Sequence, residues 1–458
     1  MKRTPLAVAA RWLGVQCSSE RAISHVTVDS RQVGPGSLFF ALPGSRTDGH
    51  QFVEEVLAAG GCAVVSQFVT DDPHVMTVDD TLQAMQTLAT HYLSQHNPLV
   101  VGITGSNGKT TTKDFTKAVL SSKYCVHATA GNFNNEIGVP LTILSMDEPD
   151  DALVLEMGMR GSGQIAALTK MAPLDVAVIT NIGPVHLELL GSLEAVADAK
   201  GEILRGLKPG GTAVLNGDDQ RVREQWEVWR GPAFWTSSFQ QNQDLFASDL
   251  QIDSRGYPEF NVHFRNTTQR VRLPLPGRHN VSNAVAALGV GVQCGIPLDQ
   301  GADALQTASS SPMRMEVFTV STGCLVVNDA YNASPASMEA ALSTVEQMGA
   351  VGIKAGVLGD MLELGGLAPA SHAQAGRHAA KVFDEILYVG RLGGFFREGL
   401  LEEGFPMEKF EWVTKVDDAV QWVKLRVEPG NIILFKASRG IGLESLLPVV
   451  EGKERGHE

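Results

Sequence analysis

The sequence is poor in cysteine and contains no long apolar run. Its five cysteines, Cys17, Cys62, Cys125, Cys294 and Cys324, are scattered without any CxxC spacing. This excludes a disulfide framework and argues against a structural zinc site. No segment approaches the roughly 18 uncharged apolar residues that a transmembrane helix needs. We therefore expect a protein of the reducing cytoplasm that makes no stable membrane insertion.

Positive charge is also scarce. Lys and Arg number 37 against 51 Asp and Glu, which gives a net charge of −14 and a pI near 5.4. A nucleic-acid or membrane-surface binder needs a basic face, so the composition predicts no nucleic-acid partner. The basic start of the chain leads into an apolar run that Arg11 interrupts, which predicts an amphipathic helix and not a signal peptide. An anionic ligand would need a local cluster of positive groups.

Glycine, in contrast, is abundant, with 47 residues. A hydrophobic share of 43%, a charged share of 19% and only 6% aromatics are typical of a soluble α/β enzyme with glycine-rich turns. At roughly 150 residues per domain, the 458 residues predict three domains. Turn residues at Asn97-Pro98 and a serine-rich break before Pro312 divide the chain into 1–97, 98–311 and 312–458.

Apolar runs of strand length alternate with helical stretches in the second and third domains. The predicted strands cover 25–29, 37–42 and 62–66, then 99–104, 152–155, 176–180 and 212–215, and finally 324–327, 356–358, 386–389 and 432–435. An amphipathic helix is predicted over 81–94. The alternation indicates parallel sheets covered on both faces. The predicted fold class is α/β, with a small mixed α/β N-terminal domain, a central P-loop doubly wound domain and a C-terminal Rossmann-like domain.

A glycine-rich loop follows the strand at 99–104 and precedes a helix. Its sequence TGSNGKTT places backbone N–H groups at a helix N-terminus, where they can face an anion. Ile103 stands where the general Walker pattern has glycine, so this is a variant. Lys109 would reach the terminal phosphates and the Thr110 hydroxyl would ligate Mg²⁺. The predicted ATP contacts in this loop are Gly105, Ser106, Asn107, Gly108, Lys109, Thr110 and Thr111.

Three further residues follow predicted strands or lie on the next helix. Glu156 ends an apolar strand at the carboxyl edge of the sheet, where α/β folds bind ligands. It is a candidate Mg²⁺ ligand, and a helix-capping or surface glutamate is the alternative. His186 follows the strand at 176–180, and Lys200 lies on a predicted helix. Taken singly, the histidine is more typical of a structural residue and the lysine of a solvated one.

Several motifs together resemble one family, the ATP-dependent Mur ligases that extend the peptide stem of peptidoglycan precursors. TGSNGKTT resembles its phosphate loop, and NIGPVHLE with the downstream AKGEIL resembles the segment with a metal-binding histidine and a carbamylated lysine. The resemblance covers essentially the whole chain. It implies that His186 and a carbamylated Lys200 hold a second Mg²⁺, with both serving catalysis alongside Lys109. Carbamylation needs a neutral amine, which partial burial near a metal favours.

The resemblance also implies further nucleotide contacts. LPGRHNVSNAVAAL is similar to the family's stretch in which an asparagine contacts adenine, which maps onto Asn283, with Asn280 nearby. Arg314 in PMRME resembles the arginine that reaches the nucleotide from the third domain. Asp329 in VVNDAYNASP resembles an acidic residue that contacts ATP.

The UDP-linked precursor is expected to contact the first domain and one central loop. VDSRQVGPGSLFF resembles the family's uridine-nucleotide domain, and GNFNNEIGVP resembles a loop beside the nucleotide and the growing peptide. On spacing alone these would be ordinary turn residues. The implied contacts are Ser30, Arg31, Arg46, Asp48, His50, Asn132, Asn134 and Glu136.

Within the family, DAYNASP and GDMLELG are similar to signatures of the member that joins D-alanyl-D-alanine to a UDP-N-acetylmuramoyl tripeptide. Ser334 departs from that pattern, which usually has asparagine there. In FKASRGIG a basic pair follows the strand at 432–435 and could bind the dipeptide carboxylate, although a surface-charge interpretation remains open. The expected dipeptide contacts are Asn332, Ser334, Lys436, Ser438 and Arg439.

The expected reaction is an amide ligation through an acyl phosphate, with ATP as co-substrate and two Mg²⁺ ions. The third domain is expected to close over the reactants, and we expect a monomer whose partners are small-molecule substrates. The main alternative is a Mur ligase that adds a single amino acid to a shorter UDP-muramoyl peptide. A P-loop kinase or regulatory ATPase, a folylpolyglutamate-synthetase-like ligase and a non-catalytic nucleotide-sugar sensor are the others.

Overall fold

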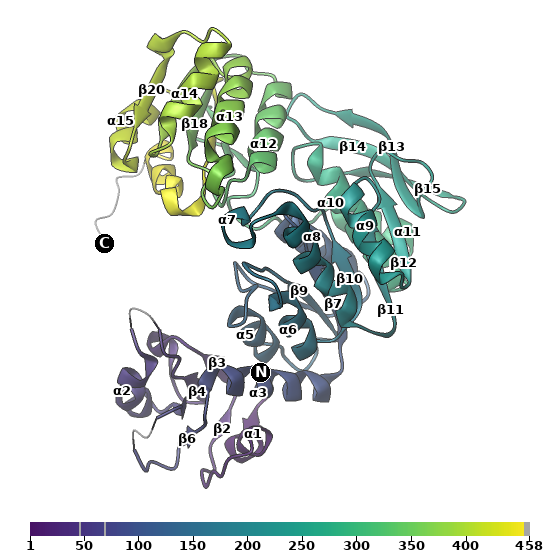
Figure 1. Ribbon diagram of the computed structural model, residues 1–458, viewed down its shortest axis with the longest axis vertical. Helices are drawn as coiled ribbons and strands as arrows, with labels where there is room; N and C mark the ends of the chain where they lie inside the picture. The colour runs from purple at the N-terminus through teal and green to yellow at the C-terminus, as the bar shows by residue number, and fades with distance from the viewer. Residues whose placement is uncertain (45–46, 68–69, 453–458) are drawn as a thin grey trace.

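The computed structural model describes residues 1–44, 47–67 and 70–452. Figure 1 shows three bodies in chain order: the first in purple at the bottom, the second in teal at the centre and right, and the third in green and yellow at the top left. No helix in the described ranges is both long and apolar enough to cross a membrane. Arg46, one of the predicted contacts, lies outside the described residues.

The first body is built on a short parallel sheet. Its strands are β3 (His25–Thr27), β4 (Ser37–Phe40), β5 (Cys62–Val65) and β6 (Val75–Thr77), in that spatial order. Its other elements are β1 (Thr4–Pro5), α1 (Leu6–Leu13), β2 (Ala22–Ile23), α2 (Val53–Ala58) and α3 (Thr81–His96). The predicted strands and the 81–94 helix are confirmed, with ends that differ by one or two residues. Asp80 caps α3 by accepting a hydrogen bond from the Gln83 backbone N–H at 2.9 Å.

The second body has a mixed sheet in the order β15-β14-β13-β12-β11-β10-β7-β9-β8. Its strands are β7 (Leu99–Thr104), β8 (Val126–Ala128), β9 (Ala152–Glu156), β10 (Leu174–Ile179), β11 (Leu207–Asn216), β12 (Ala233–Ser237), β13 (Leu245–Ile252), β14 (Pro258–Phe264) and β15 (Thr267–Arg272). Along the spatial order from β13 to β8, every pair of neighbouring strands is parallel, as predicted. The antiparallel β13–β15 extension was not predicted.

Helices cover both faces of this sheet (Figure 1). One face packs against α4 (Lys109–Leu120), α10 (His279–Gln293) and α11 (Leu298–Gln306). The other packs against α5 (Gly138–Leu144), α6 (Gln164–Met171), α8 (Leu193–Gly201) and α9 (Gln220–Trp229). Strands buried on both faces explain the nearly continuous apolar runs of β7, β9 and β10.

The third body is a second doubly wound unit, with sheet order β16-β17-β21-β18-β19-β20. Its strands are β16 (Glu316–Thr319), β17 (Leu325–Asn328), β18 (Lys354–Gly359), β19 (Glu385–Val389), β20 (Phe410–Val413) and β21 (Ile432–Lys436). Its helices are α12 (Pro335–Gln347), α13 (Ala368–Val382), α14 (Gly393–Glu402), α15 (Val420–Lys424) and α16 (Leu447–Val450). All pairings are parallel except β16 with β17. The four predicted strands of this domain are confirmed.

Candidate active site

The phosphate loop needs glycine at two positions. Gly105 has φ 150° and Gly108 has φ 79°. A Cβ atom at Gly105 would lie 1.9 Å from the Thr180 hydroxyl oxygen, and one at Gly108 would lie 2.3 Å from Asn283 Oδ1. Both the backbone conformation and the close approach therefore exclude larger residues. The chain passes directly from β7 through this loop into α4, as the sequence predicted.

The loop is fastened to the end of β10. The Asn107 backbone N–H donates to Asn181 Oδ1 at 2.9 Å, and its carbonyl oxygen accepts from the Thr180 hydroxyl at 2.6 Å. The Ser106 hydroxyl donates to the Gly183 carbonyl at 2.9 Å. These bonds link the phosphate loop to the residues that follow β10.

Two lysine side chains converge on one loop carbonyl. Lys109 Nζ donates to the Gly105 carbonyl at 2.9 Å, and Lys200 Nζ donates to the same oxygen at 2.8 Å. Burial lowers the pKa of Lys109, partly opposed by the Glu156 carboxylate. Burial, with a smaller contribution from the Lys109 charge, lowers the pKa of Lys200 well below its usual value. Both amines therefore lose a proton more readily here than an exposed lysine does.

Thr110, Glu156, Asn134 and Arg314 form a connected polar group beside this loop. The Thr110 hydroxyl donates to Glu156 Oε2 at 2.7 Å, and Asn134 Nδ2 donates to Glu156 Oε1 at 2.7 Å. From the third body, Arg314 Nη2 donates to Thr110 Oγ1 at 3.0 Å. A hydroxyl and a carboxylate in contact provide the hard oxygen ligands that Mg²⁺ prefers.

His186 lies where the second and third bodies meet. It precedes α7 (Leu187–Leu190) with φ 54°, and its Nδ1 lies 2.7 Å from Oε2 of Glu363 in the third body, itself at φ 63°. Burial lowers the pKa of His186, opposed by Glu363. Within the described residues no group of three or more His, Cys, Asp or Glu side chains could hold a metal ion. A second metal site would need a ligand of another kind.

The predicted adenine contacts are buried on α10. Asn283 Oδ1 accepts from the Thr112 hydroxyl at 3.2 Å, and Asn283 Nδ2 donates to Asn280 Oδ1 at 3.0 Å. Asn280 Nδ2 in turn donates to the Pro276 carbonyl at 2.8 Å. The structure brings this pair next to the phosphate loop at Gly108. Their contact with adenine stays a prediction.

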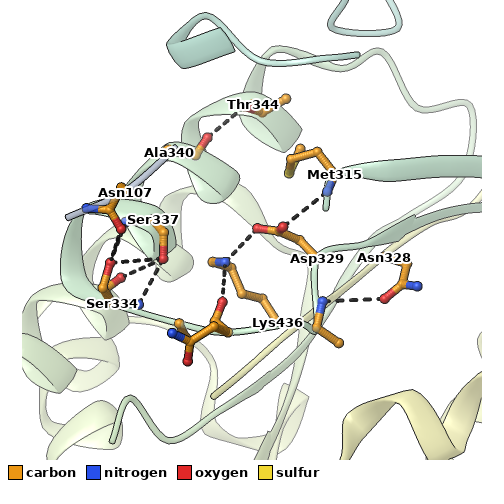
Figure 2. Close-up of polar contacts among 12 residues, drawn as sticks. Asn107, Met315, Asn328, Asp329, Ser334, Ser337, Ala340, Thr344 and Lys436 are labelled. Carbon is orange, nitrogen blue, oxygen red and sulfur yellow. Dashed lines mark hydrogen bonds and ion pairs between the residues drawn. The ribbon is translucent and has the colours of Figure 1, made fainter. Parts of the chain in front are cut away.

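Asp329 and Lys436 form a buried ion pair in the third body (Figure 2). Lys436 Nζ donates to Asp329 Oδ2 at 2.5 Å and to the Asn332 carbonyl at 3.1 Å, and the lysine side chain is 1% exposed. The Met315 backbone N–H donates to the other Asp329 oxygen at 3.1 Å. The lysine charge is thus paired inside the fold, and the contacts of Lys436 with the dipeptide and of Asp329 with ATP stay predictions.

Ser334 and Ser438 are buried as well. The Ser334 hydroxyl donates to Asn107 Oδ1 in the phosphate loop at 2.7 Å (Figure 2). The Ser438 hydroxyl accepts from the Leu362 backbone N–H at 2.9 Å and donates to the Ala333 carbonyl at 3.3 Å. Both hydroxyls therefore bond within the protein, and their predicted dipeptide roles remain untested.

Tyr331 supports two arginines. The Arg314 guanidinium lies 4.0 Å from the centre of the Tyr331 ring, and the Arg439 guanidinium lies 5.9 Å from it. Arg439 also pairs with Glu444 at 3.2 Å, and its side chain is half-exposed. Asn332 is exposed beside them. Of the predicted dipeptide contacts, Arg439 and Asn332 are therefore those that a ligand could reach from solvent.

The predicted UDP contacts fall into separate groups. Ser30 and Arg31 lie in one short helical turn that Asp29 caps. Arg31 is exposed, and its guanidinium forms a bidentate pair with the Asp29 carboxylate at 2.8 and 2.7 Å. This pairing lowers the pKa of Asp29. Asn132 and Glu136 are exposed on the loop before α5. An exposed guanidinium is free to exchange its carboxylate partner for a phosphate.

Asp48 and His50 are already engaged with each other. His50 Nδ1 lies 2.6 Å from Asp48 Oδ1, and His50 Nε2 accepts from the Ser66 backbone N–H at 2.9 Å. Hydrogen bonds from His50 lower the pKa of Asp48. With both ring nitrogens occupied, His50 orients this loop. Its contact with a ligand stays a prediction.

Three residues of the site were not predicted from the sequence. Glu363 lies in GDMLELG and Tyr331 in DAYNASP, so both lie inside motifs that were noted without their individual roles. Asn181, which holds the phosphate loop, begins NIGPVHLE. Their positions at the ends of predicted strands were the signal available, because such ends meet at one edge of a parallel sheet.

Comparison with known proteins identifies the family. Residues 22–99 match the Mur ligase family catalytic domain, 103–291 the Mur ligase middle domain, and 313–439 the Mur ligase glutamate ligase domain. The chain is 40% identical over 457 residues to the UDP-N-acetylmuramoyl-tripeptide--D-alanyl-D-alanine ligase of Bacillus subtilis, with 98% of each chain covered. The chain belongs to the Mur ligase family.

Solved Mur ligase structures share the arrangement of the whole chain. A crystal structure of MurF from Acinetobacter baumannii has a TM-score of 0.89 at 28% identity and covers 99% of this chain and 100% of its own. MurF ligase from Thermotoga maritima in complex with ADP has a TM-score of 0.82 at 29% identity, covering 94% and 97%. The Mur ligase assignment thus holds for all three bodies of the fold.

Proposed function

We propose that this chain is an ATP-dependent ligase that joins D-alanyl-D-alanine to a UDP-N-acetylmuramoyl tripeptide through a new amide bond. The observation that carries the proposal is the 40% identity, over 98% of both chains, to a relative with that name. The polar group around Thr110 and Glu156 supplies the corresponding chemistry. The free state of all five cysteines fits a reducing, cytoplasmic setting.

The phosphate loop is proposed to hold ATP. Its backbone N–H groups and Lys109 would face the phosphates, and Arg314 would reach them from the third body. Lys109 bonds to loop carbonyls, and Arg314 bonds to the Thr110 hydroxyl. Both cations are therefore held within reach of the loop and can exchange these neutral acceptors for phosphate oxygens.

The residues around Thr110 fit a Mg²⁺ ion. The Thr110 hydroxyl and the Glu156 carboxylate are 2.7 Å apart, and both are buried beside the loop. A bound Mg²⁺ would neutralise negative charge on the transferring phosphoryl group. Arg314 would release the Thr110 hydroxyl for that purpose.

A second Mg²⁺ is proposed near His186 and Lys200. Lys200 is 3% exposed, and its lowered pKa favours the neutral amine that carbamylation requires. A carbamate would supply the oxygen ligands that histidine and carboxylate side chains alone do not provide here. The carbamate nitrogen would keep one N–H, which could still donate to the Gly105 carbonyl.

The proposed reaction has two steps. The terminal carboxylate of the tripeptide attacks the γ-phosphorus of ATP, forming an acyl phosphate and releasing ADP. The amine of D-alanyl-D-alanine then attacks the acyl carbon, and the tetrahedral intermediate expels phosphate and loses a proton. Lys109 and Arg314 stabilise the charge that both steps gather, while the closed third body excludes water from the acyl phosphate.

The incoming groups are proposed to bind at exposed arginines. Arg439 would take the dipeptide carboxylate in place of Glu444, and Arg31 would take the uridine diphosphate in place of Asp29. In each exchange the guanidinium keeps an anionic partner, and the planar group can bind that partner in a bidentate way. We expect the enzyme to act as a monomer, because each ligand is assigned residues from one chain.

The decisive experiment follows phosphate release with ATP and UDP-N-acetylmuramoyl tripeptide, and adds either D-alanyl-D-alanine or single amino acids. Stimulation by the dipeptide, with a product of the corresponding mass, is expected. Stimulation by a single amino acid with a shorter precursor would instead support the alternative Mur ligase activity. Equal ADP release without either peptide substrate would show an ATPase and refute the ligase proposal.

A further inference from the structure

A hydrogen bond between Ser334 and Asn107 joins the third body to the phosphate loop. Ser334, at the start of α12, donates its hydroxyl proton to Asn107 Oδ1 at 2.7 Å (Figure 2). The two residues are 227 positions apart in the sequence. Ser334 is 7% exposed, so the bond is shielded from competing water.

The Ser334 hydroxyl is engaged with protein groups as both donor and acceptor. It donates to Asn107 Oδ1, lies 3.1 Å from the Ser337 hydroxyl oxygen as a second acceptor for its proton, and accepts from the Ser337 backbone N–H, which it caps, at 3.3 Å. A hydroxyl offers one proton and two lone pairs. The dipeptide contact of Ser334 stays a prediction, and the observed bond links it to the phosphate loop.

Asn107 is equally constrained on its other side. Its backbone N–H and carbonyl are fixed by Asn181 and Thr180 at the end of β10. Its side-chain oxygen Oδ1 accepts the hydrogen bond from Ser334. Pro335, directly after Ser334, is the first residue of α12, and its fixed φ angle suits the start of a helix. The helix therefore begins at the contact between Ser334 and Asn107.

We propose that Ser334 and Asn107 are positioning residues that dock the third body on the phosphate loop and couple nucleotide binding to placement of the dipeptide site. The inference rests on the proposed binding of ATP to this loop. A loop ordered by phosphates presents Asn107 Oδ1 to Ser334, and docking in turn stabilises the loaded loop. By linkage, both effects have the same size.

The test compares three variants in the full chain. Ser334→Ala removes the docking bond and weakens the cap of α12. Ser337→Ala is the matched control, since it also weakens the cap but leaves the bond to Asn107. Ser334→Asn restores a donor toward Asn107 and can still cap the helix.

The readouts need no peptide substrate. They are the Kd of a non-hydrolysable ATP analogue with Mg²⁺, and the hydrogen-exchange protection that the analogue induces at the start of α12. For Ser334→Ala we expect about a fivefold weaker Kd, the size of one neutral hydrogen bond, and loss of the induced protection. The control and Ser334→Asn should stay within about twofold of the parent. A parent-like Kd and protection in Ser334→Ala would overturn the proposal.

A double-mutant cycle separates docking from substrate contact. If Ser334 acts through Asn107, adding Ser334→Ala to Asn107→Ala should cause no further loss of kcat/KM. If Ser334→Ala instead raises the KM for D-alanyl-D-alanine equally with and without Asn107→Ala, Ser334 contacts the dipeptide and the docking proposal is wrong. Because the parent enzyme is assayed for ligation alongside, failure of the docking proposal is distinguishable from failure of the proposed function.

Discussion

Burial determines the chemistry of Lys200. Its position on α8 would ordinarily make it a solvated surface lysine, but its side chain turns inward to the phosphate loop and is 3% exposed. Removing an ammonium group from water disfavours its charged form, and the neighbouring Lys109 adds repulsion. The residue therefore gives up its proton more readily than an exposed lysine and can react with CO₂ as a free amine.

Lys200→Arg is expected to lower kcat for ligation by about a hundredfold or more, because a guanidinium cannot become a carbamate ligand. The measurement is phosphate release with all three substrates. Lys208→Arg is the control, since Lys208 forms a partly exposed pair with Asp175 that arginine can keep. Full activity in Lys200→Arg would disprove the carbamate.

Tyr331 is expected to act through its ring face. Tyr331→Leu should raise the KM for both ATP and the dipeptide by about fivefold, since a cation–π contact contributes roughly 1 kcal/mol to the placement of each arginine. Tyr331→Phe keeps the ring beside Arg314 and Arg439 and should stay within about twofold. Steady-state kinetics with each substrate varied in turn checks this. Equal losses in the two variants would assign the effect to the hydroxyl.

At the scale of elements, the AKGEIL motif serves two purposes. Lys200 points to the phosphate loop, whereas Glu202 caps a neighbouring helix. Glu202 Oε1 accepts from the Gly163 backbone N–H at 2.6 Å, and Oε2 accepts from the Ala166 N–H at 3.0 Å, both at the start of α6. A carboxylate also interacts favourably with the positive end of the helix dipole. Part of the motif is therefore structural.

Glu202→Ala is expected to reduce the free energy of unfolding by about 1–3 kcal/mol, because two N–H groups at the start of α6 lose a charged acceptor. Urea denaturation followed by circular dichroism measures this. Glu224→Ala, on the exposed face of α9 where Glu224 accepts from Gln220, should change stability by no more than about 0.5 kcal/mol. Equal stability of the two variants would show that the cap is unimportant.

At the scale of the whole molecule, Tyr92 joins the first body to the second. Its hydroxyl accepts from the Lys2 backbone N–H and donates to the Met146 carbonyl, each at 2.8 Å. The ring lies in an apolar core that runs without a break from α3 to the central sheet. Burial raises the pKa of Tyr92 above its usual value of 10.0.

This pKa shift predicts a pH dependence. Above about pH 10 the unfolded chain loses the tyrosine proton while the folded chain keeps it, so the free energy of unfolding falls as the pH rises. Tyr92→Phe should be less stable by about 1–2 kcal/mol at neutral pH and should show a shallower alkaline decline. Thermal or urea unfolding from pH 7 to 11 compares the two. Parallel curves in the alkaline range would contradict the assignment.

The second and third bodies also meet beside the phosphate loop. Arg314 contacts Thr110, Ser334 contacts Asn107, and Glu363 contacts His186. Each contact joins the third body to the second beside the predicted phosphate site. Because the third body contacts the phosphate loop directly, nucleotide binding to that loop can affect the position of the third body without a chain of intervening residues.

Much of this arrangement could be predicted from the sequence because it depends on local patterns. Continuous apolar runs gave β7, β9 and β10, and the glycines with Lys109 and Thr110 gave the phosphate loop. The β13–β15 extension was missed although β14 alternates apolar and polar residues as a half-buried strand does, because the prediction relied on continuous apolar runs and β15 is mostly polar. Side-chain partners across domains were beyond any local pattern.

The sequence by itself determined the α/β class, the three-part order and the residues available for phosphate chemistry, because periodicity, glycine and strand ends act over a few neighbouring positions. Only the tertiary structure decided how those residues are used. It buried Lys200 against Gly105, paired Lys436 with Asp329, and directed Ser334 to Asn107. These outcomes depend on burial and on partners more than 90 residues away, as for Lys200 and Gly105 with a separation of 95.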